Sequence, residues 1–303
     1  MPEYRLYRGQ SKKHRNAAFI PSALRSNCIE FMESKLTKYG IDVQHYKQIC
    51  RPNKILQQYC NPDYQPPIEA FYAYWLSLVN CALAVNENPI CFSFCHSYIF
   101  TKNSDTEKIG TFGLKPERIG EVCFSYAKDF FDSEKTNETF HLQLIMHDYA
   151  FFQHFNHALS KLNSNFPILF PTLTLDWTWD IDSAERFADM GDEKGTVLSI
   201  SWDAYVNWNP TKNYKVCHLN TSEMRIPSFG FESYKNNPPW DEFDWYSQDN
   251  NLMIEQDGAI IFWPWKYTID QLKNNPLGKT FDFIEINRKK FWKGFCRPWQ
   301  KPT

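Results

Sequence analysis

The chain has 303 residues, with 33 Lys or Arg against 35 Asp or Glu, so its formal net charge at pH 7 is −2. This balance gives no overall attraction to nucleic acid or to an anionic membrane, although a local basic patch is compatible with it. Aromatic residues make up 17% of the sequence and glycine is scarce. The composition therefore predicts an ordered, aromatic-rich core and argues against a disordered chain.

Cysteine usage and one apolar segment bear on where the protein acts. Nine cysteines are scattered without the spacing of a disulfide framework, and the first residues do not resemble a signal peptide, so we expect free thiols and a cytoplasmic location. The apolar segment Ile68–Val85 is barely long enough to span a membrane. Because Glu69, Ser77 and Asn80 interrupt it, we interpret it as a buried helix and expect no membrane contact.

The first strand is expected at residues 3–9, where Tyr4, Leu6 and Arg8 share one face. Gly9 lets the backbone turn directly after Arg8, so the guanidinium of Arg8 would face a cleft at the end of the strand. An arginine that pairs with a buried carboxylate explains the same pattern. Both interpretations of Arg8 stay open at this point.

Apolar residues at helical spacing predict three helices in the first half of the chain. They cover Ser22–Leu36, the buried segment Ile68–Val85, and Phe140–Leu162. Between them we expect loops, a short strand at Pro89–Cys95 and a turn around Lys115–Arg118.

Two groups of metal-ligating residue types lie close together in the sequence. The first is three histidines near one face of the third predicted helix: His147, His154 and His157. The second is a short cluster: Cys91, Cys95 and His96. Neither has a second ligand pair at a recognisable spacing, so ordinary surface or network residues are the favoured interpretation and no metal is expected.

The stretch Phe170–Asp189 is typical of a strand, a polar corner and a helix. Thr172–Trp177 contains β-branched, aliphatic and aromatic residues, which favour a strand. Asp176, Trp177 and Thr178 would then lie at the end of the strand, facing the start of the helix. Polar side chains in such a corner are both rigidly held and accessible, which suits a binding site.

The helix after this corner has a predicted start and a predicted buried stripe. Asp182 and Glu185 form a capping-box pattern at its beginning. Ala184, Phe187 and Ala188 recur at i, i+3 and i+4, so we expect these three to be buried.

Two more strands are predicted at Gly195–Trp202 and Ala259–Trp263. The run Asn207–Asn250 is polar and rich in Pro and Asn, which indicates surface loops. Glu255 and Gln256 form an acidic turn shortly before the last of these strands.

The C-terminal segment Phe281–Thr303 interleaves basic and aromatic residues. Such a segment can hold a phosphate backbone and stack on bases. A solvated terminal helix packed by its aromatic residues explains the same pattern and is the preferred interpretation. The sequence contains no P-loop and no dinucleotide-binding glycine motif, so the common nucleotide-binding frameworks are not supported.

Three separated pieces of the sequence resemble the FRG family, and together they extend over nearly the whole chain. They are Tyr7–Gly9, Pro171–Thr178 with the following Ala184–Ala188, and Gln256–Gly258. The chain departs from the family pattern at Phe166–Pro167, where members carry Gln-His, and at Leu252, where they carry arginine.

The same pieces, in the same order, resemble the arginine-serine-glutamate class of ADP-ribosyltransferases. The places of that class's site residues would be taken by Arg8 with Gly9, then Asp176, Trp177 and Thr178, then Glu255 or Gln256. The resemblance implies an α+β fold with a split, mixed β core. We expect one domain over residues 1–303, with a helical insertion at about 22–165 and a loop-rich insertion at about 207–250.

The resemblance also implies NAD as co-substrate. A carboxylate such as Glu255 would stabilise the oxocarbenium-like state that forms when the nicotinamide–ribose bond breaks. Arg8 would bind the NAD phosphates or ribose, while Thr178 or Asp176 would orient the nicotinamide end beside a stacking Tyr or Trp. In an extended strand Glu255 and Gln256 point in opposite directions, so one of them faces the cleft and the choice stays open.

The expected function is that of an ADP-ribosyltransferase-like enzyme that uses NAD to modify a nucleic acid (RNA or DNA) or a protein. Family members often occur in bacterial toxin–antitoxin or anti-phage defence settings, which would imply an antitoxin protein as a partner. The alternative is a non-catalytic FRG module that binds a nucleotide or a partner. A third hypothesis, a metal-dependent hydrolase built on the three histidines, would require stoichiometric zinc.

Overall fold

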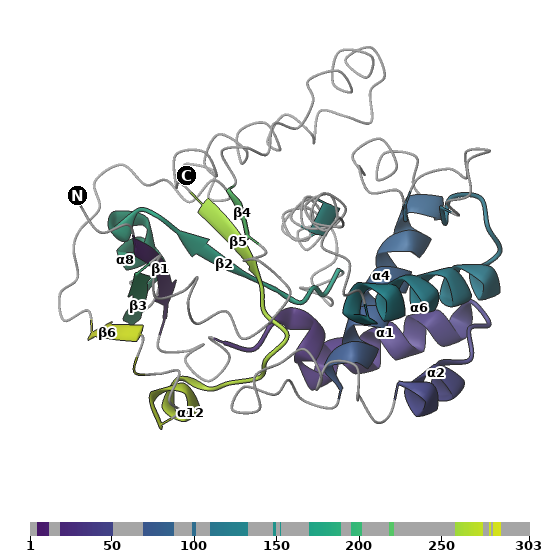
Figure 1. Cartoon of the computed structure of the whole chain (residues 1–303), viewed down its shortest axis with the longest axis horizontal. Coiled ribbons are helices and arrows are strands. Elements are labelled where there is room, and N and C mark those ends of the chain that lie inside the picture. The colour runs from purple at the N-terminus through teal and green to yellow at the C-terminus, as the bar shows by residue number, and fades with distance from the viewer. Residues whose placement is uncertain are drawn as a thin grey trace, which may run out of the picture.

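The computed structural model of the chain describes residues 5–11, 19–50, 69–87, 99–100, 110–132, 148–149, 152, 170–188, 195–201, 218–220, 258–274, 279 and 281–285. Its longer helices gather at one end and a β-sheet lies at the other (Figure 1). The helices and strands are segregated, so the expected α+β class is confirmed.

A single sheet contains the strands of the described residues: β1 Arg5–Gln10, β2 Thr174–Thr178, β3 Thr196–Ser201, β4 His218–Asn220, β5 Gly258–Phe262 and β6 Phe281–Glu285. Their order is β4-β5-β2-β1-β3-β6, and each neighbouring pair is antiparallel. The prediction of a mixed sheet is therefore wrong. The reason is that β2 and β3, which run in the same direction, lie on either side of β1 and not next to each other.

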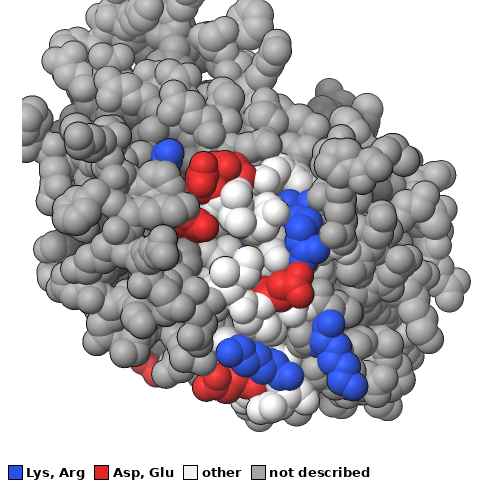
Figure 2. All heavy atoms as spheres, turned by 90° about the vertical axis from the view of Figure 1, so that its left-hand side faces the viewer, with Lys and Arg blue, Asp and Glu red and all other residues white. Residues whose placement is uncertain are grey.

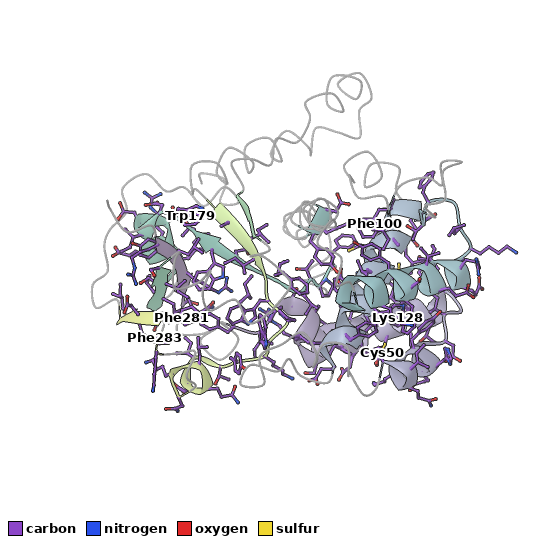
Figure 3. The ribbon with its side chains drawn as sticks, viewed as in Figure 1. Cys50, Phe100, Lys128, Trp179, Phe281 and Phe283 are labelled. Atoms are coloured by element: carbon purple, nitrogen blue, oxygen red, sulfur yellow. The ribbon has the colours of Figure 1, made fainter. Side chains whose placement is uncertain are left out.

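One face of the sheet carries an aromatic-rich core. Leu6 of β1 and Trp177 of β2 point into it, and helix α12 (Ile269–Asn274) packs over them. Phe281 and Phe283 extend this core along β6, at the end of the sheet beside α12 (Figure 3).

The opposite face is covered by helix α8 (Ile181–Ala188), which connects β2 to β3. Ala184 and Ala188 of this helix pack against Val197, with Tyr7 beside them. Because these side chains are small, the helix lies close to the strands. The unit of β2, α8 and β3 therefore holds β1 in its middle.

The helical end consists of α1 Ser26–Lys38, α2 Val43–Ile49, α4 Ala70–Glu87 and α6 Pro116–Asp132 (Figure 1). Residues 70–85 of α4 are all buried, which confirms the predicted buried helix. Trp75 of α4 donates a 3.0 Å hydrogen bond to the carbonyl of Gly120 and stacks on Tyr46 at 4.2 Å between ring centroids. In the part of the chain that the structure describes, no helix has both the length and the apolar character needed to cross a membrane.

The first predicted helix begins later than expected. Ser22–Leu24 forms a short 3₁₀ helix, η2, and α1 begins at Ser26 after the extended residue Arg25. The hydroxyl of Ser22 is hydrogen-bonded to the backbone of Thr172, so η2 is attached to the segment that leads into β2. This tertiary contact replaces the first turn of the predicted helix.

The predicted turn at Lys115–Arg118 is wrong, because α6 begins there. Pro116 occupies the first helical position, where its missing N–H is tolerated. Ile119, Cys123 and Ala127 are buried at i, i+4 and i+8, so the sequence carries a helical signal in this segment. Helix α2 was not predicted either.

Two strands lie in segments for which other structures were expected. β4 falls inside Asn207–Asn250, expected to be loops, and β6 begins Phe281–Thr303, expected to be a helix. In β6, Phe281 and Phe283 alternate with Asp282, which is a strand pattern. Predictions for residues 202–217, 221–257 and 286–303 lie outside the described residues.

Several other predictions also fall outside the described residues, namely the strand Pro89–Cys95 and the candidate ligands Cys91, Cys95, His96, His147, His154 and His157. Of the third predicted helix, Asp148, Tyr149 and Phe152 are described, and each is helical and buried. Among the described residues, no group of three or more His, Cys, Asp or Glu is arranged to hold a metal ion. The described cysteines are buried and form no disulfide with one another.

Candidate functional site

The two central strands of the sheet separate along most of their length. β1 pairs with β3 from Arg5 to Gln10, but within the described strands it pairs with β2 at one position, where Tyr7 lies opposite Thr178. β2 meanwhile pairs with β5 along its whole length. The six strands therefore form two three-stranded halves. We call the interval between residues 8–10 of β1 and 174–177 of β2 the β1–β2 split.

Arg8 lies at the start of the β1–β2 split, directly after the paired residue Tyr7. Its guanidinium donates a hydrogen bond to the backbone carbonyl of Asp176 on the other side. This bond joins the two halves of the sheet where their backbone pairing ends. Arg8 is thus placed where the strands open, and its contact is a backbone carbonyl of the predicted corner.

Burial dominates the electrostatics of Arg8. The pKa of its guanidinium is lowered to about 10: loss of solvent lowers it most, the charge of Asp176 raises it, and the charge of Arg25 lowers it. By exposed area Arg8 is half-buried, so part of the side chain stays reachable from solvent. The guanidinium is protonated at neutral pH, and its arginine neighbour makes the location favourable for an anion.

The predicted corner divides between the two faces of the sheet. Tyr7 and Thr178 lie opposite each other and share a face, and alternation along β2 adds Asp176 to that face. Arg8 and Trp177 lie on the other face by the same alternation. The structure therefore brings Arg8 to the backbone of Asp176 and not to the hydroxyl of Thr178.

Trp177 belongs to the aromatic core of the sheet. Its side chain is 4% exposed. The ring stacks on Phe281 at 6.1 Å between centroids and lies tilted against Phe19 at 6.0 Å. A ring enclosed in this way does not offer a face for stacking on nicotinamide. Its indole Nε1 has no hydrogen-bond partner among the described residues, so this N–H is the group that Trp177 can offer to a ligand.

Thr178 helps to begin helix α8. Its Oγ1 accepts a 2.9 Å hydrogen bond from the N–H of Asp180. The carboxylate of Asp180 then accepts from the amides of Asp182 and Ser183, at 3.1 and 2.9 Å, and caps the helix. The predicted capping box of Asp182 and Glu185 is therefore wrong, because the cap lies two residues earlier.

Gly9 lies inside β1 and not at a turn after it, so the predicted turn is wrong. A Cβ on Gly9 would lie 1.8 Å from the carbonyl oxygen of Ala184, and one on Gly195 would lie 1.9 Å from that of Ala188. The two glycines let α8 rest directly on the backbone of β1 and on the residue before β3. Phe187, predicted to be buried, is 40% exposed because the helix presents its small side chains to the sheet.

The predicted catalytic residues Glu255 and Gln256 lie outside the described residues. Gly258, two positions after Gln256 in the sequence, begins β5 and pairs with Thr178. Thr178 is also the residue of β2 that pairs with β1. Gly258 is the last residue of the third piece that resembles the FRG family. It therefore lies two strands away from β1 and next to Thr178, where the split begins.

Arg25 is a candidate site residue that the sequence did not single out. It stands between η2 and α1, and its Nε donates a 3.2 Å hydrogen bond to the carbonyl of Ile20. Burial lowers the pKa of Arg25, while Cys28 acts in the opposite direction. One basic residue before a helix carries no sequence signal for a binding site, and its proximity to Arg8 arises from tertiary contacts.

The surface charge of the sheet end is mixed. Figure 2 shows basic and acidic side chains of the described residues interspersed on this side of the molecule. On this side, a uniform basic patch of the kind that attracts nucleic acid is not formed by the described residues.

Comparison with known proteins found no match for the chain among family models, curated proteins or solved structures.

Proposed function

We propose that the chain is an ADP-ribosyltransferase-like enzyme that uses NAD as co-substrate and transfers ADP-ribose to a nucleic acid or a protein. The proposal starts from the resemblance of the three sequence pieces to the FRG family and to the arginine-serine-glutamate class. One arrangement carries it, namely the β1–β2 split with Arg8 at its start.

The β1–β2 split supports the proposal because a core divided into two halves is what the resemblance implies. Tyr7 and Thr178 are the last paired residues before the strands diverge. Arg8 follows immediately, half-buried and positively charged, with its guanidinium directed across the split to Asp176. A planar fork of donors at this position suits the phosphates or ribose of a dinucleotide better than a lysine would.

The chemistry needs a negative charge near the ribose. When the nicotinamide–ribose bond breaks, positive charge develops on the ribose, and a fixed carboxylate stabilises it. We assign this role to Glu255, because its carboxylate is ionised at neutral pH. If Gln256 faced the ribose instead, its uncharged amide would leave a site that binds NAD but transfers poorly. A nucleophile of the acceptor then bonds to the ribose carbon while nicotinamide leaves with the electrons of the broken bond.

The test is incubation of the purified full chain with NAD labelled in its adenylate portion and with separate pools of RNA, DNA and protein. We expect label in one pool together with released nicotinamide, and loss of both in Arg8→Ala and Glu255→Ala. Arg5→Ala is the matched control, because Arg5 stands on the same strand but binds Asp282 and Ser199. This variant should retain transfer.

The same experiment separates the alternative function. A folded protein that binds nucleotide without label transfer or nicotinamide release would be a binding module. Undiminished transfer by Arg8→Ala would exclude the β1–β2 split as the NAD site. If the transferase acts as a toxin, expression of the wild-type chain should slow bacterial growth and expression of Arg8→Ala should not.

A further inference from the structure

Arg25 is held beside the β1–β2 split by the turn that precedes it. The N–H of Ala23 donates a 3.1 Å hydrogen bond to the carbonyl of Thr172. Further along the same segment, the carbonyl of Asp176 accepts from Arg8. In an extended chain Thr172 and Asp176 are about 13 Å apart. Arg25 and Arg8 therefore flank one stretch of strand edge.

The charge of Arg25 is not paired with a carboxylate of the described residues. The charge of Asp176 acts on Arg8. The hydrogen bond of Arg25 to the carbonyl of Ile20 uses Nε, so the two terminal nitrogens of the guanidinium can donate to a ligand. Each arginine has a pKa lowered by burial, and the charge of Arg25 adds to the lowering at Arg8. Burial disfavours the charged form of each guanidinium group. An anion bound near Arg8 and Arg25 would favour that charged form.

One further group beside Arg25 can interact with an anion. Arg25 is the N-cap residue of the 13-residue helix α1, with no side-chain cap and no acidic residue in the first turn. The amides of that turn lack intrahelical acceptors, and the helix dipole is positive at this end.

We infer that Arg25 is a second anion-binding residue, and that Arg8 and Arg25 together bind the diphosphate of a dinucleotide or nucleoside diphosphate at the β1–β2 split. The inference rests on the proposed function for the nature of the ligand, but Arg25 belongs to none of the sequence motifs behind that function. Two guanidinium groups match a diphosphate, because each presents a planar fork of donors to phosphate oxygens and offsets negative charge.

Titration calorimetry of the full chain with ADP, inorganic pyrophosphate and adenosine tests the inference. Arg25→Gln should weaken ADP and pyrophosphate binding by about 10- to 100-fold, the usual effect of losing charge-assisted hydrogen bonds. Adenosine affinity should change less than about twofold, because adenosine has no phosphate. Arg25→Lys, which keeps the charge but not the fork, should lose less than Arg25→Gln. Lys38→Gln, at the other end of α1, is the matched control and should bind as the wild type does.

The outcomes separate this inference from the proposed function. Normal ADP and pyrophosphate affinity in a folded Arg25→Gln protein would overturn the inference, even if the wild type releases nicotinamide from NAD. Loss of ADP affinity through Arg25, in a wild type that releases no nicotinamide, would support the inference and overturn the transferase. A wild-type chain that binds neither ADP nor pyrophosphate would also overturn the inference.

Discussion

The two edges of β1 have opposite characters. Within the described strands, the edge that faces β3 pairs from Arg5 to Gln10, whereas the edge that faces β2 pairs at Tyr7 alone. The closed edge is reinforced by α8, which rests on Gly9. The open edge is bridged by a side chain, Arg8, and not by backbone pairing. The comparison separates an edge that provides stability from an edge that binds the ligand in the proposed function.

The two arginines of β1 show the same contrast at the level of single residues. Arg5 donates to the carboxylate of Asp282 and, at 3.1 Å, to the hydroxyl of Ser199, so it ties β1 to β3 and β6. Arg8 donates to a carbonyl across the split and has a second arginine, Arg25, as its electrostatic neighbour. Arg5 is therefore a structural link, and Arg8 is the arginine to which we assign the proposed contact with an anion.

Substitution of Gly9 should disturb the closed edge most strongly. Gly9→Ala places a Cβ 1.8 Å from the carbonyl oxygen of Ala184, so α8 or β1 must move. We expect the free energy of unfolding to fall by about 3 kcal/mol or more, measured by urea unfolding. This is more than a surface substitution normally costs.

Gly120→Ala is the control for this experiment. Gly120 lies within α6, and a Cβ there would lie 3.4 Å from the hydroxyl oxygen of Tyr46, close to ordinary contact. We expect no loss of stability, and a gain of up to about 1 kcal/mol from the higher helix propensity of alanine. Wild-type stability of Gly9→Ala would show that α8 does not rest on β1 as described.

The paired variants Arg8→Ala and Arg5→Ala should have opposite effects. Arg8→Ala should weaken NAD binding by about 100-fold, because a charged group that meets the phosphates is lost. Arg5→Ala should change NAD affinity less than about twofold and lower the free energy of unfolding by about 1 kcal/mol, since its ion pair with Asp282 is partly exposed. Calorimetric titration and urea unfolding of both proteins measure the two effects. Equal losses of affinity would remove the distinction between the edges.

The start of α8 gives a smaller effect. Asp180→Ala removes the carboxylate that accepts from the amides of Asp182 and Ser183, so we expect a loss of about 1–2 kcal/mol in urea unfolding. Asp182→Ala is the control, with an expected loss of less than about 1 kcal/mol, because Asp182 contributes through the helix dipole alone. A larger loss from Asp182→Ala would restore the capping box that the sequence predicted.

The smallest effect is expected at the far end of the split. Ser22→Ala removes the hydroxyl that accepts a 2.9 Å hydrogen bond from the N–H of Thr172 and should cost about 1 kcal/mol in urea unfolding. Because this contact helps to hold Arg25 in place, ADP affinity should also fall a few-fold. Ser26→Ala, at the exposed start of α1, is the control and should change neither quantity. Unchanged ADP affinity in Ser22→Ala would show that η2 does not position Arg25.

Local sequence patterns predicted the elements whose burial follows one simple period. β2, β3 and β5 lie within two residues of the strands expected from β-branched and apolar runs, and α4 matches the predicted buried helix. β6 and α6 were missed for a different reason. The alternation of Phe281 and Phe283 is short and precedes a basic, aromatic tail, and the apolar positions of α6 lie among charged residues.

The roles of individual residues depended on contacts between distant segments. Gly9 was interpreted as a turn because its helix neighbour, Ala184, lies far along the chain. Arg25 was overlooked because its place beside the sheet depends on η2, whose Ser22 contacts Thr172 across a separation of 150 positions. The position of Arg8 in a strand could be predicted, since it follows from a local pattern beside a glycine, whereas its role stays a prediction.

Hydrogen–deuterium exchange of the full chain with and without saturating NAD would compare both edges of β1 in one experiment. If NAD binds at the β1–β2 split, backbone exchange should slow in peptides covering residues 22–28 and 172–178, and should stay unchanged in peptides covering 196–201 and 281–285. Slower exchange confined to the second pair of peptides, or none in residues 172–178, would place NAD elsewhere and refute the β1–β2 split as its site.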